Sequence, residues 1–77
     1  MKEEEKVRKQ LEKQLEKVNR RLEILDMIEE KLYHMKELTQ RALDEDLMDE
    51  EIIKINMKVN NLGEQVSLLD MQATELS

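Results

Sequence analysis

The segment Glu50–Leu76 reads EEIIKINMKVNNLGEQVSLLDMQATEL. Its apolar residues recur at alternating steps of three and four, which places them on one face of an α-helix. The a positions of this heptad are Ile52, Val59, Val66 and Ala73, and the d positions are Ile55, Leu62, Leu69 and Leu76. The repeat predicts a helix over 50–75 that packs along another helix. It passes through Asn60-Asn61-Leu62-Gly63 without a change of phase, which favours a continuous helix over a break into two short ones.

A second, longer helix is predicted upstream, over 2–43, where the chain has neither proline nor glycine. Its apolar residues also follow steps of three and four. They are Val7, Leu11, Leu15, Val18, Leu22, Leu25, Ile28, Leu32, Met35, Leu38 and Ala42. Oppositely charged pairs one turn apart, such as Glu37 and Arg41, favour the same helix.

The residues 44–49 interrupt both patterns and predict the connecting loop. Asp49 is a candidate N-cap for the second helix, with Met48 and Ile53 placed as a hydrophobic staple. A connection this short makes the two helices antiparallel neighbours.

The two apolar patterns also match each other layer by layer. In an antiparallel hairpin, the numbers of facing residues have a nearly constant sum. Suitable pairs are Leu15 with Leu76, Leu22 with Leu69, Leu25 with Val66, Leu32 with Val59, and Met35 with Ile55. We therefore predict a single all-α domain over 1–77, an antiparallel two-helix hairpin with a long first helix and a shorter second one.

Apolar residues remain that this hairpin does not bury. Val7 and Leu11 lie on an arm beyond the reach of the second helix, and others form a further flank. The predicted interface comprises Val7, Leu11, Ile24, Met27, Leu38, Ile53, Met57, Leu68 and Met71. Apolar surface of this extent on a small protein usually marks an interaction site. The simplest closure is a homodimer in which two hairpins form a four-helix bundle or coiled coil. Because several of these residues are methionines, a groove for another protein's helix is the alternative.

Charge and composition exclude several classes of protein. The net charge is −6, and there is no cysteine to form a disulfide or a thiolate site. Residues 1–21 carry eight Lys/Arg against five Glu, whereas 22–77 carry five against fourteen acids. The first stretch is too acidic and too apolar for a DNA-reading arm, so we expect no nucleic-acid partner. No apolar run is long enough for a membrane span, and Met1–Glu5 has no signal-peptide character, so we expect a cytoplasmic protein.

No active site is predicted. His34 is the only histidine, and although Glu30 and Glu37 lie within one turn of it, we interpret it as a solvated helix-face residue. The hydroxyl residues have no histidine near them in sequence, and there is no phosphate-binding glycine loop or calcium loop. We therefore expect no catalytic residue, no cofactor and no metal.

The stretch Leu32-Tyr33-His34-Met35-Lys36-Glu37-Leu38-Thr39-Gln40-Arg41-Ala42 is followed by a polar loop and a second amphipathic helix. In this order, residues 25–70 resemble the N-terminal helical rod region of bacterial flagellins. Lys36 and Thr39 replace an arginine and an alanine of the flagellin pattern. The resemblance implies a shared helical hairpin in a bacterial protein, either derived from that rod segment or mimicking it.

The sequence thus predicts a non-enzymatic structural or protein-interaction module that self-associates through amphipathic helices. The alternative is a small adaptor, regulator or chaperone-like protein that holds a helix of another protein, with a flagellin-related partner as one case.

Overall fold

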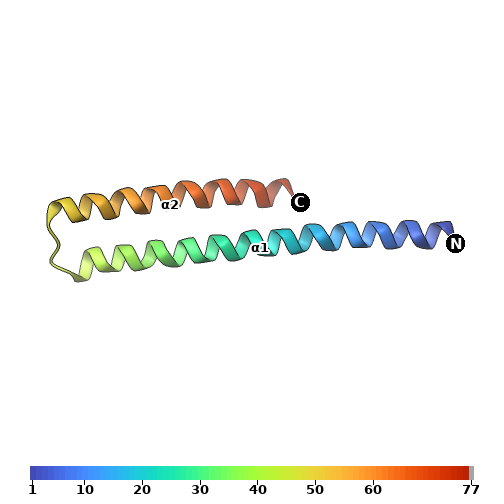
Figure 1. The fold of residues 1–77 in the computed structure, drawn as a ribbon, viewed down its shortest axis with the longest axis horizontal. Helices are drawn as coiled ribbons and strands as arrows, with labels where there is room; N and C mark the ends of the chain where they lie inside the picture. Colours follow the sequence, from blue (N-terminus) through green and yellow to red (C-terminus); the bar gives the residue numbers. More distant parts are fainter. Residues whose placement is uncertain (77) are drawn as a thin grey trace.

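Two antiparallel helices joined by a short connection make up the hairpin in Figure 1. A computed structural model describes residues 1–76. Helix α1 spans Lys2–Asp44 and helix α2 spans Asp49–Glu75. This confirms the predicted all-α hairpin, with α1 ending one residue later and α2 beginning one residue earlier than expected. Helix α2 runs through Gly63 without interruption, as its heptad predicted.

The molecule is a rod. Its Cα extents are 70 × 17 × 10 Å and its radius of gyration is 19.5 Å. A compact domain of 77 residues would have a radius of gyration of about 11.5 Å. Helix α1 continues well beyond the end of α2, and this free part carries the N-terminus (Figure 1). We call residues 2–18 of α1 the arm.

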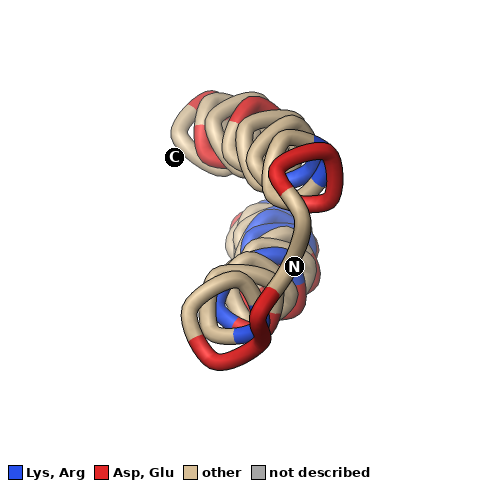
Figure 2. Tube along the Cα trace, turned by 90° about the vertical axis from the view of Figure 1, so that its left-hand side faces the viewer, with Lys and Arg blue, Asp and Glu red and all other residues tan. Residues whose placement is uncertain are grey.

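The connection between the helices is made by Glu45, Asp46, Leu47 and Met48. The Glu45 N–H donates to the Arg41 carbonyl at 3.0 Å, and the Arg41 side chain pairs with the Glu45 carboxylate at 3.3 Å. Arg41 was expected to pair with Glu37. It pairs instead with the residue that follows the helix, which is also four positions away. Figure 2 looks onto this end and shows the acidic residues on both sides of the connection.

The start of α2 differs from the expected cap. Met48, in an extended conformation, is the N-cap, and it provides no side-chain hydrogen bond. Its carbonyl accepts the N–H groups of Glu51 and Ile52 at 3.0 and 3.1 Å. The expectation that Asp49 is the N-cap was wrong, because Asp49 already lies within the first turn. Its carboxylate still suits that position, since the positive end of the helix dipole favours negative charge there.

The interface between the helices is thin. Only Leu38 and Ala73 among the described residues are buried, each 8% exposed. Each helix adds a row of half-buried residues on the side that faces the other helix. On α1 these are Ile24, Ile28, Lys31, Met35 and Ala42, and on α2 they are Ile55, Val59, Leu62, Gly63, Gln65, Val66 and Leu69. The a and d positions of α2 therefore face α1, apart from Ile52, which is exposed, in agreement with the predicted heptad.

Helix α1, however, presents only part of the expected pattern to α2, since Ile28, Met35 and Ala42 face it whereas four of the leucines do not. Leu15, Leu22, Leu25 and Leu32 were expected to pack on α2, and all four are about half exposed. The register also differs. Met35 was expected opposite Ile55, but its Cε lies 3.7 Å from the position that a Cβ on Gly63 would occupy, about two turns further along α2. The predicted layer pairs were therefore wrong. The reason is that α1 carries apolar residues on more than one face, and spacing alone does not select which one meets α2.

Candidate functional site: an unpartnered helical surface

The exposed apolar residues of α1 form a continuous heptad of their own. Leu11, Val18, Leu25 and Leu32 are spaced by seven, and Leu15 and Leu22 fall between them at steps of four and three. Each of the six is between 49% and 59% exposed. We call these six residues the heptad face. It begins on the arm and continues along the part of α1 that packs on α2.

Helix α1 therefore has two apolar faces. Counted at 3.5 residues per turn, as in a supercoiled bundle, the heptad face is about 100° away from the face that packs on α2. The latter contains Ile24, Ile28, Met35, Leu38 and Ala42. A helix of a four-helix bundle contacts two neighbouring helices, which lie at roughly a right angle as seen along its axis. The two faces of α1 have the spacing that such a position requires.

Helix α2, in contrast, has one strong apolar face, and that face is used. Its outer side carries Ile53 and Met57 near one end and Leu68 and Met71 near the other, all exposed. Between these two pairs lie Asn60, Asn61 and Glu64, and Asn61 accepts a hydrogen bond from the Gln65 side chain at 3.1 Å. The outer side of α2 is thus two small apolar patches rather than a continuous stripe.

The structure divides the predicted interface residues into three groups. Val7 and Leu11 are exposed on the arm, beyond the end of α2, as expected (Figure 1). Leu38 is buried against α2 and Ile24 is half-buried. Placing Leu38 on an exposed flank was therefore wrong, because it belongs to the face of α1 that α2 covers. The remaining five residues lie at the rim of the hairpin or on the outer side of α2.

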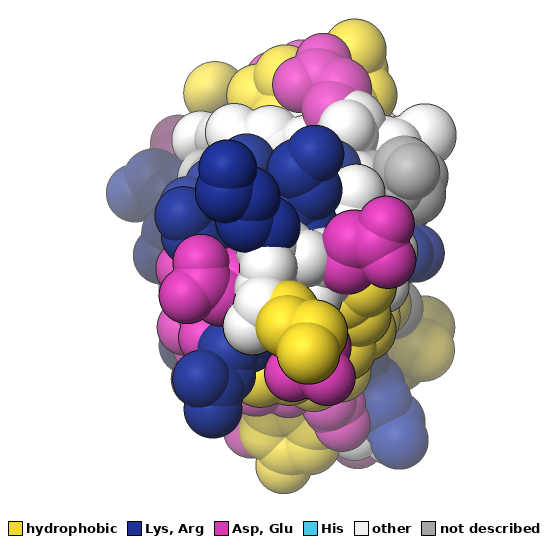
Figure 3. All heavy atoms as spheres, turned by 90° about the vertical axis from the view of Figure 1, so that its right-hand side faces the viewer, with side chains coloured by type: hydrophobic (Ala, Val, Ile, Leu, Met, Phe, Trp, Pro, Cys, Tyr) yellow, Lys and Arg dark blue, Asp and Glu magenta, His cyan; other side chains and the backbone are white. Residues whose placement is uncertain are grey.

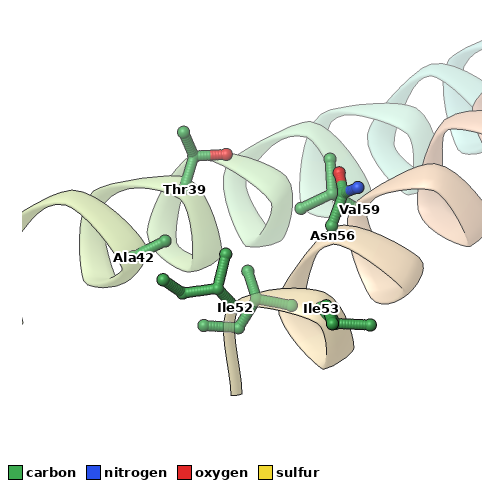
Figure 4. A pocket seen from close by; sticks show the side chains of 7 residues that line it. Thr39, Ala42, Ile52, Ile53, Asn56 and Val59 are labelled. Carbon is green, nitrogen blue, oxygen red and sulfur yellow. The ribbon is translucent and has the colours of Figure 1, made fainter. Parts of the chain in front are cut away.

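Two shallow hollows run along the junction of the helices, each of about 250 Å³. One brings Met27 and Lys31 of α1 beside Leu68 of α2, two of which were predicted interface residues. The other is drawn in Figure 4, where Thr39 and Ala42 of α1 line the hollow together with Ile52 and Val59 of α2. Ile53 lies at its edge. Apolar side chains line most of both hollows, and no charged group approaches another inside them.

The half-buried Lys31 was not foreseen in the interface. It lines the hollow beside Leu68 of α2, a place that suits lysine because its long aliphatic stem can contact apolar groups while the ammonium group stays in solvent. Thr39 is exposed beside the other hollow and donates its hydroxyl to the Met35 carbonyl at 2.8 Å, one turn back in the same helix. The position of Lys31 follows from the face that α1 presents. A repeat count starting at Ile24, with Ile28, Met35, Leu38 and Ala42, would have shown Lys31 within it.

The surface charge is uneven along the molecule. The space-filling view from the N-terminal end shows Lys and Arg side chains interspersed with Asp and Glu and with apolar side chains (Figure 3). Residues 1–21 carry a net +3, whereas 22–44 carry three Lys/Arg against six acids, a net −3. At the far end, six of the eight residues from 44 to 51 are acidic. We call these eight residues the acidic tip.

No described group of three or more His, Cys, Asp or Glu side chains is arranged to hold a metal ion, and His34 is exposed on α1. Neither helix, over the described residues, has the length and apolar character to cross a bilayer. Comparisons with protein-family models, curated proteins and solved structures give no match.

Proposed function

We propose that this chain is a non-enzymatic structural module whose work is protein–protein contact, and that it self-associates through its amphipathic helices into a dimer of hairpins. A four-helix arrangement is the closure that the two faces of α1 favour. The proposal assigns the protein no catalytic residue, cofactor or metal.

The observation that supports it is the amount of surface left uncovered. The chain exposes 7034 Å². A compact monomer of 9.3 kDa exposes about 5,000 Å². The excess, about 2,000 Å² per chain, is in the range that each subunit of an obligate homodimer buries. A single core of this size supplies at most about 3–5 kcal/mol even when well formed, and here two of the described residues are buried.

Sedimentation equilibrium over a hundredfold range of concentration tests the proposal. We expect the parent chain to be a dimer at the upper concentrations and Leu11→Asp to shift the equilibrium toward the monomer, because it places a charge on exposed apolar surface that assembly would bury. Glu12→Asp is the matched control, one residue away. A parent chain that stays monomeric at every concentration would refute self-association.

The second candidate is an adaptor that holds a helix of another protein. The observation that favours it is the hollow beside Met27 and Leu68, where flexible and apolar side chains from both helices meet. The resemblance of residues 25–70 to flagellin rods makes flagellin the first partner to test. A monomeric chain that binds purified flagellin with one-to-one stoichiometry by calorimetry would support the adaptor, and the absence of heat would count against this partner.

A further inference from the structure

We infer that the heptad face of α1 pairs with the same face of a second copy, and that the two α1 helices run antiparallel about a twofold axis near residue 20. This inference rests on the proposed self-association and adds the surface and the direction. Each arm would then lie along the hairpin of the other subunit, so that the dimer assembles four helices in all, with three side by side at each end.

The occupant is a second copy because the face has the pattern that pairs with itself. In an antiparallel coiled coil, a residues of one helix meet d residues of the other. With the axis near residue 20, Val18 meets Leu22 of the partner subunit, and Leu15 meets Leu25 of the partner subunit. Twofold symmetry repeats both contacts, which makes four consecutive apolar layers. The heptad face is also the longest continuous apolar stripe that the hairpin leaves uncovered.

The end of α2 is compatible with this arrangement. All buried or half-buried residues of α1 lie at position 24 or beyond, so α2 covers only the distal part of that helix. The heptad face is about 100° away from α2 along this shared part. A partner helix can therefore lie beside α1 without displacing α2. The excess of about 2,000 Å² per chain leaves enough surface for this contact.

Charge selects the antiparallel direction. That direction places the +3 half of one α1 along the −3 half of the other, and brings the start of each arm toward the acidic tip of the other subunit. A parallel pair would place +3 beside +3, and would bring two acidic tips together, each with six carboxylates in eight residues. Like charges at that spacing repel within a Debye length of about 10 Å at 0.1 M salt.

Spin labels test the direction together with the position of the axis near residue 20. The chain has no cysteine, so Lys13→Cys and His34→Cys each accept one label. The two sites are 21 residues apart, which is three heptads, and both are exposed on the same side of α1. In a parallel dimer the label-to-label distance between subunits is the same at both sites. In the antiparallel dimer the labels are separated along the axis by roughly 20 Å at Lys13 and roughly 40 Å at His34.

We expect double electron–electron resonance to give a distance at least 10 Å longer for His34→Cys than for Lys13→Cys, at a concentration where sedimentation shows the dimer. Equal distances in a dimer would overturn the inference and leave self-association intact. A chain that is monomeric throughout would overturn both.

A pair of charge insertions tests the surface. Leu22→Asp places two carboxylates near the proposed axis, and we expect the dimer dissociation constant to rise by a hundredfold or more. Asn60→Asp is the control, which adds the same charge at an exposed position on the outer side of α2, and it should leave the constant within threefold. A larger rise in the dissociation constant for the α2 variant than for Leu22→Asp would place the contact on α2 and overturn the inference. Circular dichroism of both variants at high concentration checks that the helices remain.

Discussion

Gly63 lowers the stability of the helix in which it lies, and the fold tolerates it because the fold depends on helix packing. It lies in the middle of α2, half-buried, where glycine lowers helix stability by about 1 kcal/mol relative to alanine. Its backbone is ordinary helix, since no described glycine has a positive φ. The nearest atom to an added Cβ is the flexible end of Met35, at 3.7 Å. There is thus room for a methyl group but not for a large side chain.

Gly63→Ala should therefore stabilise the chain by about 0.5–1 kcal/mol, because it removes backbone freedom from the unfolded state without a steric conflict. Urea unfolding at a fixed protein concentration measures this. Gly63→Leu is the comparison, and we expect it to lower stability because the larger side chain would displace Met35. A loss of stability in Gly63→Ala would mean that Met35 lies closer to an added Cβ at position 63 than 3.7 Å and leaves no room for the methyl group.

Helix α1 differs from α2 in having two apolar faces, and the two are expected to respond differently to substitution. Leu38 is buried against α2, whereas Leu22 is 54% exposed on the heptad face. Both are leucines in the interior of the same helix, so their helix propensities cancel in a comparison. The remaining difference between the stability effects of the two substitutions reports whether the leucine packs within one chain or between two chains.

Leu38→Ala should lower the free energy of unfolding by about 2–3 kcal/mol at every protein concentration, the loss typical of a buried leucine. Leu22→Ala should change little at concentrations where the chain is monomeric, and should lower stability only where it dimerises. Urea unfolding at two concentrations a hundredfold apart separates the effects. Equal losses for both variants at low concentration would place Leu22 inside the hairpin, contrary to its exposure.

The molecule as a whole is a rod with a basic end and an acidic end, and its charge distribution should influence assembly more than its net charge does. Net charge opposes association equally wherever it is changed, whereas local charge acts only on the surface it faces. Two lysine pairs offer the comparison, because Lys6 and Lys9 lie on the arm, and Lys54 and Lys58 on α2.

Reversing either pair to glutamate changes the net charge from −6 to −10, by four units in both cases. We expect Lys6→Glu/Lys9→Glu to weaken the dimer several-fold more than Lys54→Glu/Lys58→Glu, as measured by sedimentation at 0.05 M NaCl, and the difference to shrink at 0.5 M NaCl as the charges are screened. Equal weakening by both pairs would show that only net charge matters.

The secondary structure and the fold class could be read from the sequence because they depend on local spacing. The apolar residues from Ile52 to Leu76 recur at steps of three and four, which requires a helix. The acidic stretch around Asp46 has no such repeat and therefore separates this helix from the first one. The a and d residues of α2 could be assigned to the interface because that helix has a single strong apolar face. Each of these inferences uses residues within a few turns of one another.

The face and register of α1 could not be read in the same way. Leu22 and Met35 both fit a steps-of-three-and-four pattern, and the pattern assigned both to the contact with α2, but only Met35 lies there. The choice depends on how the four-residue connection joins the helices and on which side chains fit across the interface, as with Met35 beside Gly63. Those are contacts between residues far apart in the chain. Spacing along one helix thus showed that α1 has more apolar surface than a hairpin can cover, and the packing of α2 against it revealed which part is left exposed.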